Sequence, residues 1–503
     1  MSLLDDVSIV VTPNGYKAGE LYAVIPVPTE GSEKIINGSN TIAGANWNAN
    51  SNWDKTVAGL FSCDGTSSAD INQGGNLPTV NLQYIISFEI LSINSGGKFV
   101  ANYGGVVGTN RTSVGVYSEI ITAVNSTERI RVRPNATGTV GSVTGISVKE
   151  YTSADMDVTR ATDATRVDEN GLIADVLANV PRIDYTGGGC PHILAEPQRT
   201  NLIPYSDFSD FSTIGDSVIT LNNSISPDGT NNATNVTFTT GRIDESVLSF
   251  TDDTDYTFSF WAKKGGTLTT ATCFVKINSG SNISQQITLT DNWQKFSLTA
   301  NSLTGSSVNT IGFRDEATDI ELFGAQLEEG SYPTSLIPTS GSTVTRNQDI
   351  FTRDGIGSLI NSEEGVLFGE IAALSDDGTN RYLSINDGTT SNYIYFRFVS
   401  TSNTVLMRTV VAGVTINTLQ TAITDTTDFN KFAFKWKSGD YAFWINGVES
   451  LVDASATIFG ADVLNTIEFS FPASGGGGFP SKVKQLQVYD TALDDTQLAA
   501  LTS

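Results

Sequence analysis

The chain has a single histidine, His192, which follows Cys190 by two residues in a turn-rich segment. A thiol beside an imidazole is the pairing from which a cysteine nucleophile and its base are built. The two-residue spacing fits no known catalytic arrangement, and a structural role is the more common one for a lone histidine. The three cysteines Cys63, Cys190 and Cys273 are too far apart in sequence to indicate a zinc site or a disulfide framework. The sequence does not exclude a cation site made of oxygen ligands.

Carboxylates are abundant, with 54 Asp and Glu residues against 29 Lys and Arg. Polysaccharide hydrolysis uses two carboxyl groups on either side of one glycosidic bond. The visible candidates are adjacent pairs such as Glu328-Glu329 and Glu363-Glu364, and neighbours on a strand point to opposite faces. The sequence also shows no long array of short β-helix coils, the usual scaffold of such enzymes. We therefore expect a protein that is not an enzyme, with a polysaccharide depolymerase as one alternative.

Aromatic side chains are the second group with possible chemistry, because sugar rings stack on exposed aromatic rings near loops. Trp47 and Trp53 lie in an Asn-rich, loop-like stretch, where exposure and core packing are both open. The candidate ligand-binding residues are Trp47, Trp53, Tyr103 and Trp293. Core packing is favoured for the tryptophans within alternating strands, namely Trp261, Trp436 and Trp444.

Two aspartates in the C-terminal part of the chain are candidates for a calcium site. Asp387 and Asp462 lie beside glycine or apolar runs, and calcium is bound by carboxylate and carbonyl oxygens. Calcium is the one cofactor that the sequence suggests, and nothing in the sequence shows that it is required.

The formal net charge of −25 repels phosphate backbones and anionic lipid surfaces, so nucleic acid is not an expected partner. Solubility alone accounts for such a charge, and cation binding or a basic partner are alternatives. No apolar run reaches the roughly 20 residues that span a bilayer, and residues 1–6 lack the features of a secretory signal. We expect synthesis in a cytoplasm. Assembly into a virus released by lysis is one route from there to the outside.

The composition predicts an all-β chain of several domains, because Gly, Asn, Ser and Thr suit turns whereas Val, Ile, Phe and Tyr suit strands. A chain of 503 residues also exceeds what one core supports. Short strands separated by turns predict jelly rolls at 35–151 and 201–340, the second repeating the strand order of the first. A third sandwich is predicted at 365–503, ending in a helix over 492–501.

Three further segments precede or join these domains. Residues 1–34 contain a hairpin that is too small to fold alone, so we expect it to complete itself on another subunit. Residues 152–200 form a structured connector, in which strand-like pieces alternate with turns. The sequence Val-Thr-Arg of residues 158–160 recurs at 344–346, in the linker 341–364, which indicates one kind of joint used twice.

The connector carries distinctive motifs: Asn-Gly-Leu-Ile at 170–173, Pro-Arg-Ile-Asp-Tyr at 181–185 and Glu-Pro-Gln-Arg-Thr-Asn-Leu at 196–202. With these motifs the connector resembles a segment shared by tail-fibre, head-fibre and other virion proteins of bacteriophages. The chain begins with Leu-Leu-Asp-Asp-Val-Ser at 3–8 and Pro-Asn-Gly-Tyr-Lys at 13–17. This beginning is similar to the start of many such phage proteins, which implies that residues 1–34 dock to the virion.

The C-terminal domain carries Trp-Ile-Asn-Gly at 444–447 and Val-Tyr-Asp-Thr-Ala-Leu at 488–493. It resembles the concanavalin A-like, laminin-G-like lectin sandwich. The two earlier domains resemble carbohydrate-binding-module jelly rolls. Members of these families often bind glycans, frequently with calcium, but many serve only as spacers, so fold alone does not assign a ligand.

Together these resemblances imply a phage virion structural protein, a tail or head fibre whose glycan-binding-type domains adhere to host or environmental polysaccharide. The alternatives are a capsid decoration protein without a ligand and a tailspike depolymerase. The expected partners are other virion proteins, bound through residues 1–34, and cell-surface glycans. By analogy with phage fibres we expect a homo-oligomer, with a trimer favoured. The expected location is the virion surface, after synthesis in the cytoplasm of a bacterial host.

Overall fold

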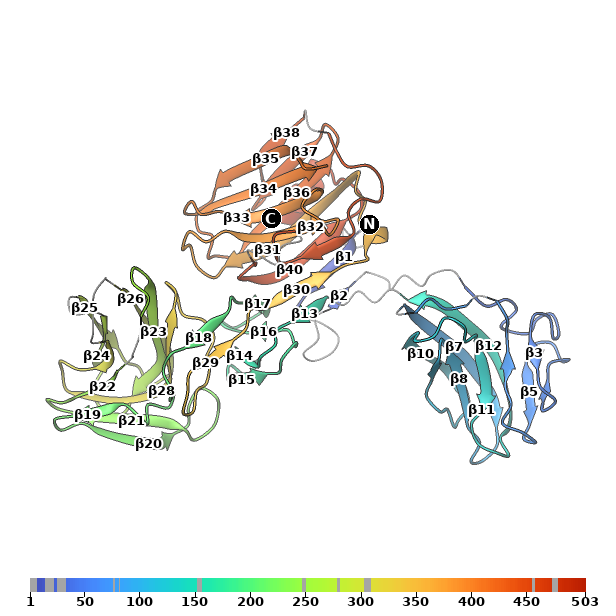
Figure 1. Ribbon diagram of the computed structural model, residues 1–503, viewed down its shortest axis with the longest axis horizontal. Coiled ribbons are helices and arrows are strands. Elements are labelled where there is room, and N and C mark those ends of the chain that lie inside the picture. Colours follow the sequence, from blue (N-terminus) through green and yellow to red (C-terminus); the bar gives the residue numbers. More distant parts are fainter. Residues whose placement is uncertain are drawn as a thin grey trace. The chain divides into compact units, whose positions relative to one another are not determined.

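The fold is built almost entirely from β-strands, with one α-helix, α1 (Asp495–Thr502), in the part of the chain that the structure describes (Figure 1). The all-β prediction is thereby confirmed. The computed structural model describes residues 7–13, 22–24, 33–75, 77–80, 82–151, 156–246, 250–277, 281–302, 309–454, 457–472 and 478–503. Within these residues, no helix has both the length and the apolar character that a membrane crossing requires.

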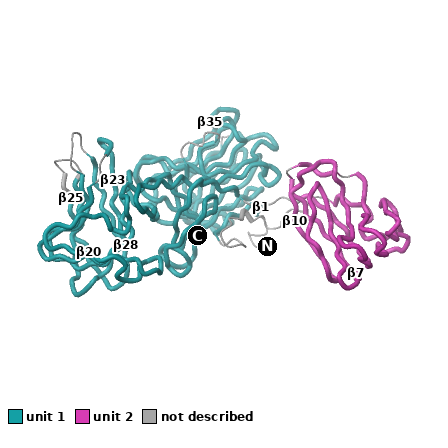
Figure 2. Tube along the Cα trace, turned by 60° about the horizontal axis from the view of Figure 1, so that its bottom comes forward, with its two compact units in different colours: residues 1–26, 155–503 teal, residues 27–154 magenta. Residues whose placement is uncertain are grey.

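The chain forms two compact units (Figure 2). Residues 27–154 make the small unit, and residues 1–26 together with 155–503 make the large unit. The large unit therefore takes in both ends of the chain, and in sequence the small unit is an insertion within it.

The small unit is a β-sandwich of two five-stranded antiparallel sheets. One sheet has the order β10 (Gly115–Thr122), β7 (Gln83–Ile93), β12 (Val140–Tyr151), β5 (Phe61–Asp64) and β4 (Trp53–Asp54). The other has the order β3 (Asn48–Ala49), β6 (Ile71–Asn72), β11 (Arg131–Pro134), β8 (Phe99–Tyr103) and β9 (Val106–Val107). In β7 buried and partly exposed residues alternate from Gln83 to Ile90, as expected for a strand with one face on a core.

A second sandwich with two five-stranded sheets lies within the large unit. Its first sheet has the order β19 (Ser212–Ile214), β22 (Arg242–Ser246), β27 (Thr310–Phe313), β24 (Thr270–Ile277) and β25 (Ser281–Thr288). Its second sheet has the order β20 (Val218–Ser224), β21 (Ala233–Phe238), β28 (Thr318–Glu329), β23 (Asp255–Lys264) and β26 (Gln294–Asn301). We call residues 202–340 the inserted sandwich.

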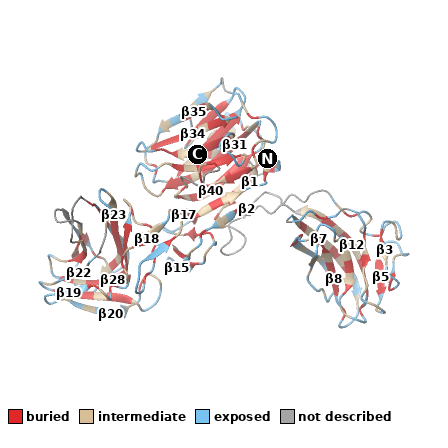
Figure 3. Ribbon diagram, viewed as in Figure 1, coloured by how far each residue is buried: buried red, intermediate tan, exposed pale blue. Residues whose placement is uncertain are grey.

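The C-terminal sandwich is larger, with sheets of nine and seven strands. The nine-stranded sheet contains β16 (Ile183–Asp184), β17 (His192–Ala195), β40 (Ser481–Tyr489), β31 (Glu364–Ala373), β36 (Asn430–Lys437), β37 (Tyr441–Ile445), β38 (Val448–Asp453), β1 (Val7–Thr12) and β2 (Tyr22–Val24). The seven-stranded sheet contains β13 (Asp157–Thr159), β30 (Ile350–Arg353), β39 (Thr466–Glu468), β32 (Arg381–Asn386), β33 (Tyr393–Phe398), β34 (Thr404–Val411) and β35 (Val414–Ala422). Buried residues, red in Figure 3, run along these strands.

The sequence predicted that the N-terminal hairpin would place its apolar face on another subunit. In the structure this face packs within the same chain. Strand β1 pairs with β40, with Ile9 opposite Val488. Ile9 and Val11 are buried there, at 1% and 0% exposure. The same edge of β40 also pairs with β17, through Val483 and its neighbours. The physical reason is that β40 offers an unpaired edge, which the alternating apolar strand β1 covers.

The sequence predicted a helix over 492–501, and α1 begins at Asp495, where a capping box fixes its start. The Asp494 carboxylate accepts a hydrogen bond from the Gln497 N–H, and the Gln497 side chain accepts one from the Asp494 N–H. This reciprocal pair satisfies two donors that a helix start otherwise leaves open. Leu498, fully buried, packs the helix into a cluster with Trp444 and Tyr489 of the C-terminal sandwich.

Candidate functional site

The inserted sandwich is attached to the C-terminal sandwich through a ribbon of two short strands, β18 (Arg199–Asn201) and β29 (Val344–Arg346). Next to this ribbon, β13 pairs with β30, and β14 (Ala164–Val167) pairs with β15 (Ile173–Val176). These pairings bring the connector and the linker together. They enclose a buried group of charged side chains, which we call the joint: Arg160, Arg182, Glu196, Arg346 and Asp349.

The charges of the joint are buried and paired with one another. The Asp349 carboxylate accepts hydrogen bonds from Arg160, at 2.8 Å, and from Arg182. The Glu196 carboxylate lies 2.5 Å from Arg182 and 2.8 Å from Arg346. All five side chains have exposed fractions of 5% or less. Since an unpaired charge at such a depth is very unfavourable, each member of the joint depends on the others.

The repeated Val-Thr-Arg sequence has a different meaning from the predicted one. The sequence indicated one kind of joint used twice, but Arg160 and Arg346 belong to a single joint. Arg160 also donates to backbone carbonyls of its own connector, including that of Leu177 at 2.7 Å. Arg346 donates to the Pro197 carbonyl at 2.8 Å. The arginines of the two Val-Thr-Arg copies therefore join the connector and the linker, because they pair with Asp349 and Glu196 of the same joint.

The pKa shifts in the joint follow from its pairing. Burial opposes the ionisation of Glu196, but Arg346 and Arg182 outweigh burial and hold the pKa of Glu196 well below its usual range. Burial likewise opposes the charge of Arg182, and there Glu196 and Asp349 prevail and raise the pKa. At Arg346 burial is the larger influence, and the pKa is lowered. Glu196 therefore stays ionised at neutral pH.

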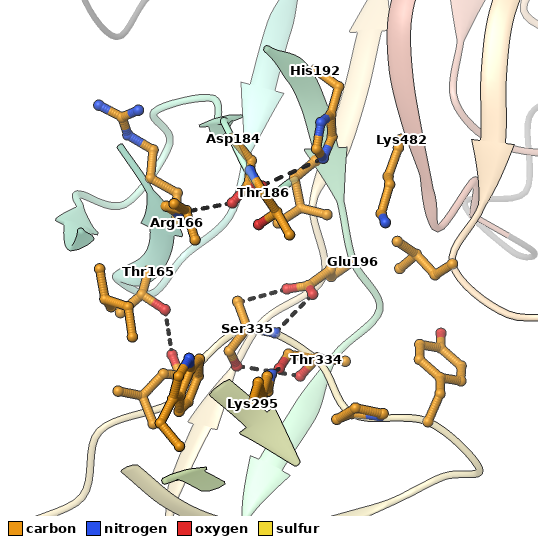
Figure 4. A pocket seen from close by; sticks show the side chains of 18 residues that line it. Thr165, Arg166, Asp184, Thr186, His192, Glu196, Lys295, Thr334, Ser335 and Lys482 are labelled. Atoms are coloured by element: carbon orange, nitrogen blue, oxygen red, sulfur yellow. Dashed lines mark hydrogen bonds and ion pairs between the residues drawn. The ribbon is translucent and has the colours of Figure 1, made fainter. Parts of the chain in front are cut away.

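A cavity of about 240 Å³ lies beside the joint, lined by the connector, the inserted sandwich and β40 (Figure 4). Its wall includes the aromatic rings of Trp261 and Tyr332 and several hydroxyl groups. Its titratable side chains, apart from Tyr332, are Arg166, Asp184, His192, Glu196, Lys295 and Lys482. Glu196 and Ser335 connect the cavity to the joint, because Ser335 donates to Glu196 at 2.7 Å.

His192 lies in the cavity wall next to Asp184. It is 2% exposed, and its Nε2 atom is 3.5 Å from Asp184 Oδ1 without forming a hydrogen bond. The Asp184 carboxylate accepts from the N–H groups of Val167 and Thr186, both at 2.8 Å. Burial is the main cause that lowers the pKa of His192 to about 4, although Asp184 acts in the opposite direction. Cys190 is exposed whereas His192 is buried, so the structure gives no support to a nucleophile pair.

Two lysines face the cavity from different domains. Lys295, on β26, donates to the Thr334 carbonyl at 2.6 Å, and its ammonium lies 4.6 Å from the centre of the Trp261 ring. Lys482, on β40, is fixed by the pairing of that strand with Leu194 of β17. In Figure 4 its ammonium is directed into the cavity, across from Glu196. Among the described residues, the ammonium group of Lys482 has no hydrogen-bond or ion-pair partner.

Trp261 was expected in the core, and it lines the cavity instead. The pairing of β23 with β28 shifts register between Ser259 and Trp261. Phe258, Phe260 and Ala262 point into the core of the inserted sandwich, so Trp261 lies on the opposite face of β23. That face is covered as well, because Ser259 is fully buried too. The sequence therefore predicted the alternating strand correctly, but it placed Trp261 on the wrong face of that strand.

The structure excludes three of the four predicted sugar-stacking residues from that role. Trp47, Trp53 and Tyr103 are 2%, 6% and 1% exposed and belong to the core of the small unit. Both indole N–H groups are also engaged: Trp47 donates to the Asn37 carbonyl at 3.0 Å and Trp53 donates to the Ala69 carbonyl at 2.8 Å. The Asn-rich stretch that suggested exposure folds over these rings.

Trp293, the fourth predicted residue, is half-buried and lies just before β26. Its indole N–H donates to the Ile225 carbonyl at 3.1 Å, and the Lys263 ammonium lies 4.8 Å from its ring centre. It is not among the residues that line the cavity. Trp293 thus keeps a partly accessible ring, away from the cavity beside the joint.

The structure does not bring the two predicted calcium ligands into a metal site. The Asp387 carboxylate accepts hydrogen bonds from Thr389 and from Asn392, at 2.6 and 2.8 Å, and so stabilises its own turn. Asp462 lies in a turn with φ 57°. Across the described ranges, no group of three or more His, Cys, Asp or Glu side chains is arranged to hold a metal ion.

Comparisons with known proteins give likenesses of structure only. Neither the protein-family models nor the curated proteins contain a match. Among solved structures, the enzymatically active domain of bacteriophage CBA120 tailspike protein 4 matches with 13% identity over 26% of this chain and 21% of that chain, at a TM-score of 0.22. The chain thus spans about a fifth of that structure.

Two further solved structures are covered almost completely. The CBM22-1-CBM22-2 tandem domain of Paenibacillus barcinonensis Xyn10C matches with 10% identity over 60% of this chain and 98% of that chain, at a TM-score of 0.22. Domains LG4-5 of the mouse laminin alpha1 chain match with 9% identity over 59% of this chain and 93% of that chain, at a TM-score of 0.20. Identities and TM-scores of this size assign neither a ligand nor an activity.

Proposed function

We propose that this protein is a structural protein of a bacteriophage virion, a tail or head fibre that displays carbohydrate-binding domains on the particle surface. The cavity beside the joint is the observation that carries the sugar-binding part. It combines the rings of Trp261 and Tyr332 with hydroxyl and charged groups in one recess, which is the kind of lining that holds a sugar ring. The assignment to a virion is supported by the motifs of the connector and of residues 1–34, which resemble those of phage proteins.

The joint supports a role in presentation. The inserted sandwich is attached by the β18–β29 ribbon, and its residue Ser335 donates a hydrogen bond to Glu196 of the joint, so it is held against the connector. Such an attachment suits a protein that presents a domain at a fixed position. It also favours a second candidate function, a capsid decoration protein that needs no ligand.

The remaining parts of the proposal concern partners. We propose attachment to other virion proteins through residues 1–34, self-association as a homo-oligomer with a trimer favoured, and no enzymatic activity. Because β1 lies in the nine-stranded sheet, a virion contact made by this segment would lie beside the C-terminal sandwich. Calcium would be an accessory to glycan binding in this proposal and not a catalytic metal.

Electron microscopy of intact particles carrying a labelled chain tests the virion part. A few copies at the tail tip are expected for receptor recognition, whereas many symmetric copies on the head would favour decoration. Absence of the chain from any particle would overturn the virion proposal.

A glycan array probed with the full chain tests the sugar-binding part. Trp261→Ala should abolish the signal because it removes the ring in the cavity wall, while Trp293→Ala serves as a matched control outside the cavity and should retain it. If Trp293→Ala loses the signal and Trp261→Ala keeps it, the sugar-binding site lies at Trp293 and not in the cavity. An array without any signal would favour the decoration protein, and sugar release from a host capsule would establish the depolymerase.

A further inference from the structure

The cavity beside the joint has an excess of positive charge, whereas the chain as a whole has an excess of negative charge. The protein carries a formal net charge of −25, yet two lysines, Lys295 and Lys482, line this one recess. Lys482 has no ion-pair partner among the described residues. Lys295 is satisfied by a neutral carbonyl, that of Thr334, and by the Trp261 ring, neither of which cancels its charge.

The two carboxylates in the same wall differ, because arginines offset the charge of Glu196 whereas Asp184 keeps its charge. Glu196 is paired with Arg182 and with Arg346, which lie behind it in the joint. Asp184 accepts two backbone N–H groups, those of Val167 and Thr186. His192 stays neutral at pH 7 because burial lowers its pKa to about 4. An anion that enters the cavity therefore meets two ammonium groups and the Arg166 guanidinium, against the single carboxylate of Asp184, with which no arginine or lysine of the described residues pairs.

The size and the apolar part of the cavity limit what else the ligand can be. Its volume of about 240 Å³ lies below the roughly 300–1,000 Å³ of sites for drug-sized ligands. One ring with its substituents fits this space better than an extended oligosaccharide. Trp261 and Leu336 offer apolar surface on which the face of such a ring can pack.

We propose that this cavity binds a sugar unit that bears a carboxylate, of the uronic-acid class. The carboxylate pairs with Lys482 and Lys295, and the sugar ring packs against Trp261. This inference rests on the proposed carbohydrate-binding function and names its ligand class. The recess is built by the connector and β40 together with the inserted sandwich, so all three parts of the large unit contribute to it.

Calorimetric titration of the full chain with glucuronate, glucose and acetate tests this proposal. Glucuronate should bind more tightly than either of the others, and added salt should weaken its binding because the attraction is electrostatic. Lys482→Met should weaken glucuronate binding by about tenfold or more, as expected when a charged hydrogen-bond donor is lost. Lys482→Arg should keep most of the affinity, since it retains the charge.

Lys484→Met is the matched control for the charge change. Lys484 lies on the same strand, pairs with Glu370 at 3.2 Å and is not among the residues that line the cavity. Its replacement should change glucuronate affinity by less than about twofold, because its charge is paired with Glu370 outside the cavity. Thermal unfolding of each variant shows whether the fold is intact, and the salt dependence of the unaltered chain tests the proposal should Lys482→Met unfold.

The outcomes separate this inference from the function on which it rests. Binding of glucose as tight as that of glucuronate would overturn the acidic-sugar inference and leave carbohydrate binding intact. Acetate binding as tight as that of glucuronate would mean a site for small carboxylates and no sugar preference. Equal losses in Lys482→Met and Lys484→Met would place the ligand outside this cavity. Failure of all sugars to bind, here and on the array, would remove both proposals.

Discussion

Replacement of Arg182 by methionine should destabilise the large unit by about 3 kcal/mol, the lower end of the range for removing one partner of a buried ion pair. Arg182 is fully buried and donates to Glu196, to Asp349 and to Ser335. Methionine fills much of the volume of the arginine side chain, but it leaves the two buried carboxylates with less positive charge beside them. The lower end is expected because each carboxylate keeps one arginine, Arg346 for Glu196 and Arg160 for Asp349.

Urea unfolding, followed for each unit separately, measures this loss. The small unit is a separate compact unit, so its transition should stay unchanged and serves as an internal control. Arg242→Met is the matched control variant, because the Arg242 side chain is 48% exposed and has Asp244 as its ion-pair partner at 2.8 Å. Its loss should be below about 1 kcal/mol, as for exposed pairs. If Arg182→Met destabilises the large unit no more than Arg242→Met, the reasoning about the joint is refuted.

Three further predictions concern other parts of the molecule. Burial lowers the pKa of His192 from 6.5 to about 4, so the unfolded chain binds more protons than the folded one between these values. The contribution of His192 to the stability of the large unit should therefore fall by up to about 3 kcal/mol as the pH drops through this window. His192→Gln should remove that slope from urea unfolding at several pH values, and an unchanged slope would contradict the assignment. Ile9→Ala, in β1, should destabilise the large unit by about 2–5 kcal/mol because Ile9 is buried against β40. A loss that depends on protein concentration would instead mean that the hairpin completes another subunit. Trp47→Ala should destabilise the small unit by about 3–5 kcal/mol and leave glycan binding unchanged, whereas lost binding with intact stability would restore Trp47 as a ligand residue.

The strands and the helix could be predicted because their signals are local. A strand such as β7 shows its period of two within a few residues, and α1 shows its cap at Asp494. The partner of β1 could not be predicted in this way. Alternating apolar residues show that Ile9 needs a surface, but the surface is Val488, at the other end of the chain. Nothing local distinguishes that edge from the edge of a second subunit.

The cavity was missed because sequence alternation assigns residues to one buried face and one exposed face. In β28 both faces are buried, one by the core of the inserted sandwich and the other by residues 334–337. Glu328, fully buried there, accepts hydrogen bonds from Gln326 and Thr334 at 2.7 and 2.9 Å. Buried polar residues at alternate positions are the signal that a second surface covers the strand. In the sequence they look like ordinary exposed residues, and so Trp261 on the neighbouring strand was assigned to the core.

The joint and the cavity depend on each other through Glu196. This carboxylate closes one side of the cavity, and its charge is offset by Arg182 and Arg346 on the side away from the cavity. With Arg182 absent, the remaining negative charge of Glu196 would act on whatever enters the cavity. Glu196 would keep Arg346 alone, and an acidic sugar would then bind more weakly, although no residue that lines the cavity had been changed. The ion pairs that join the connector to the linker therefore also allow this cavity to accept a carboxylate.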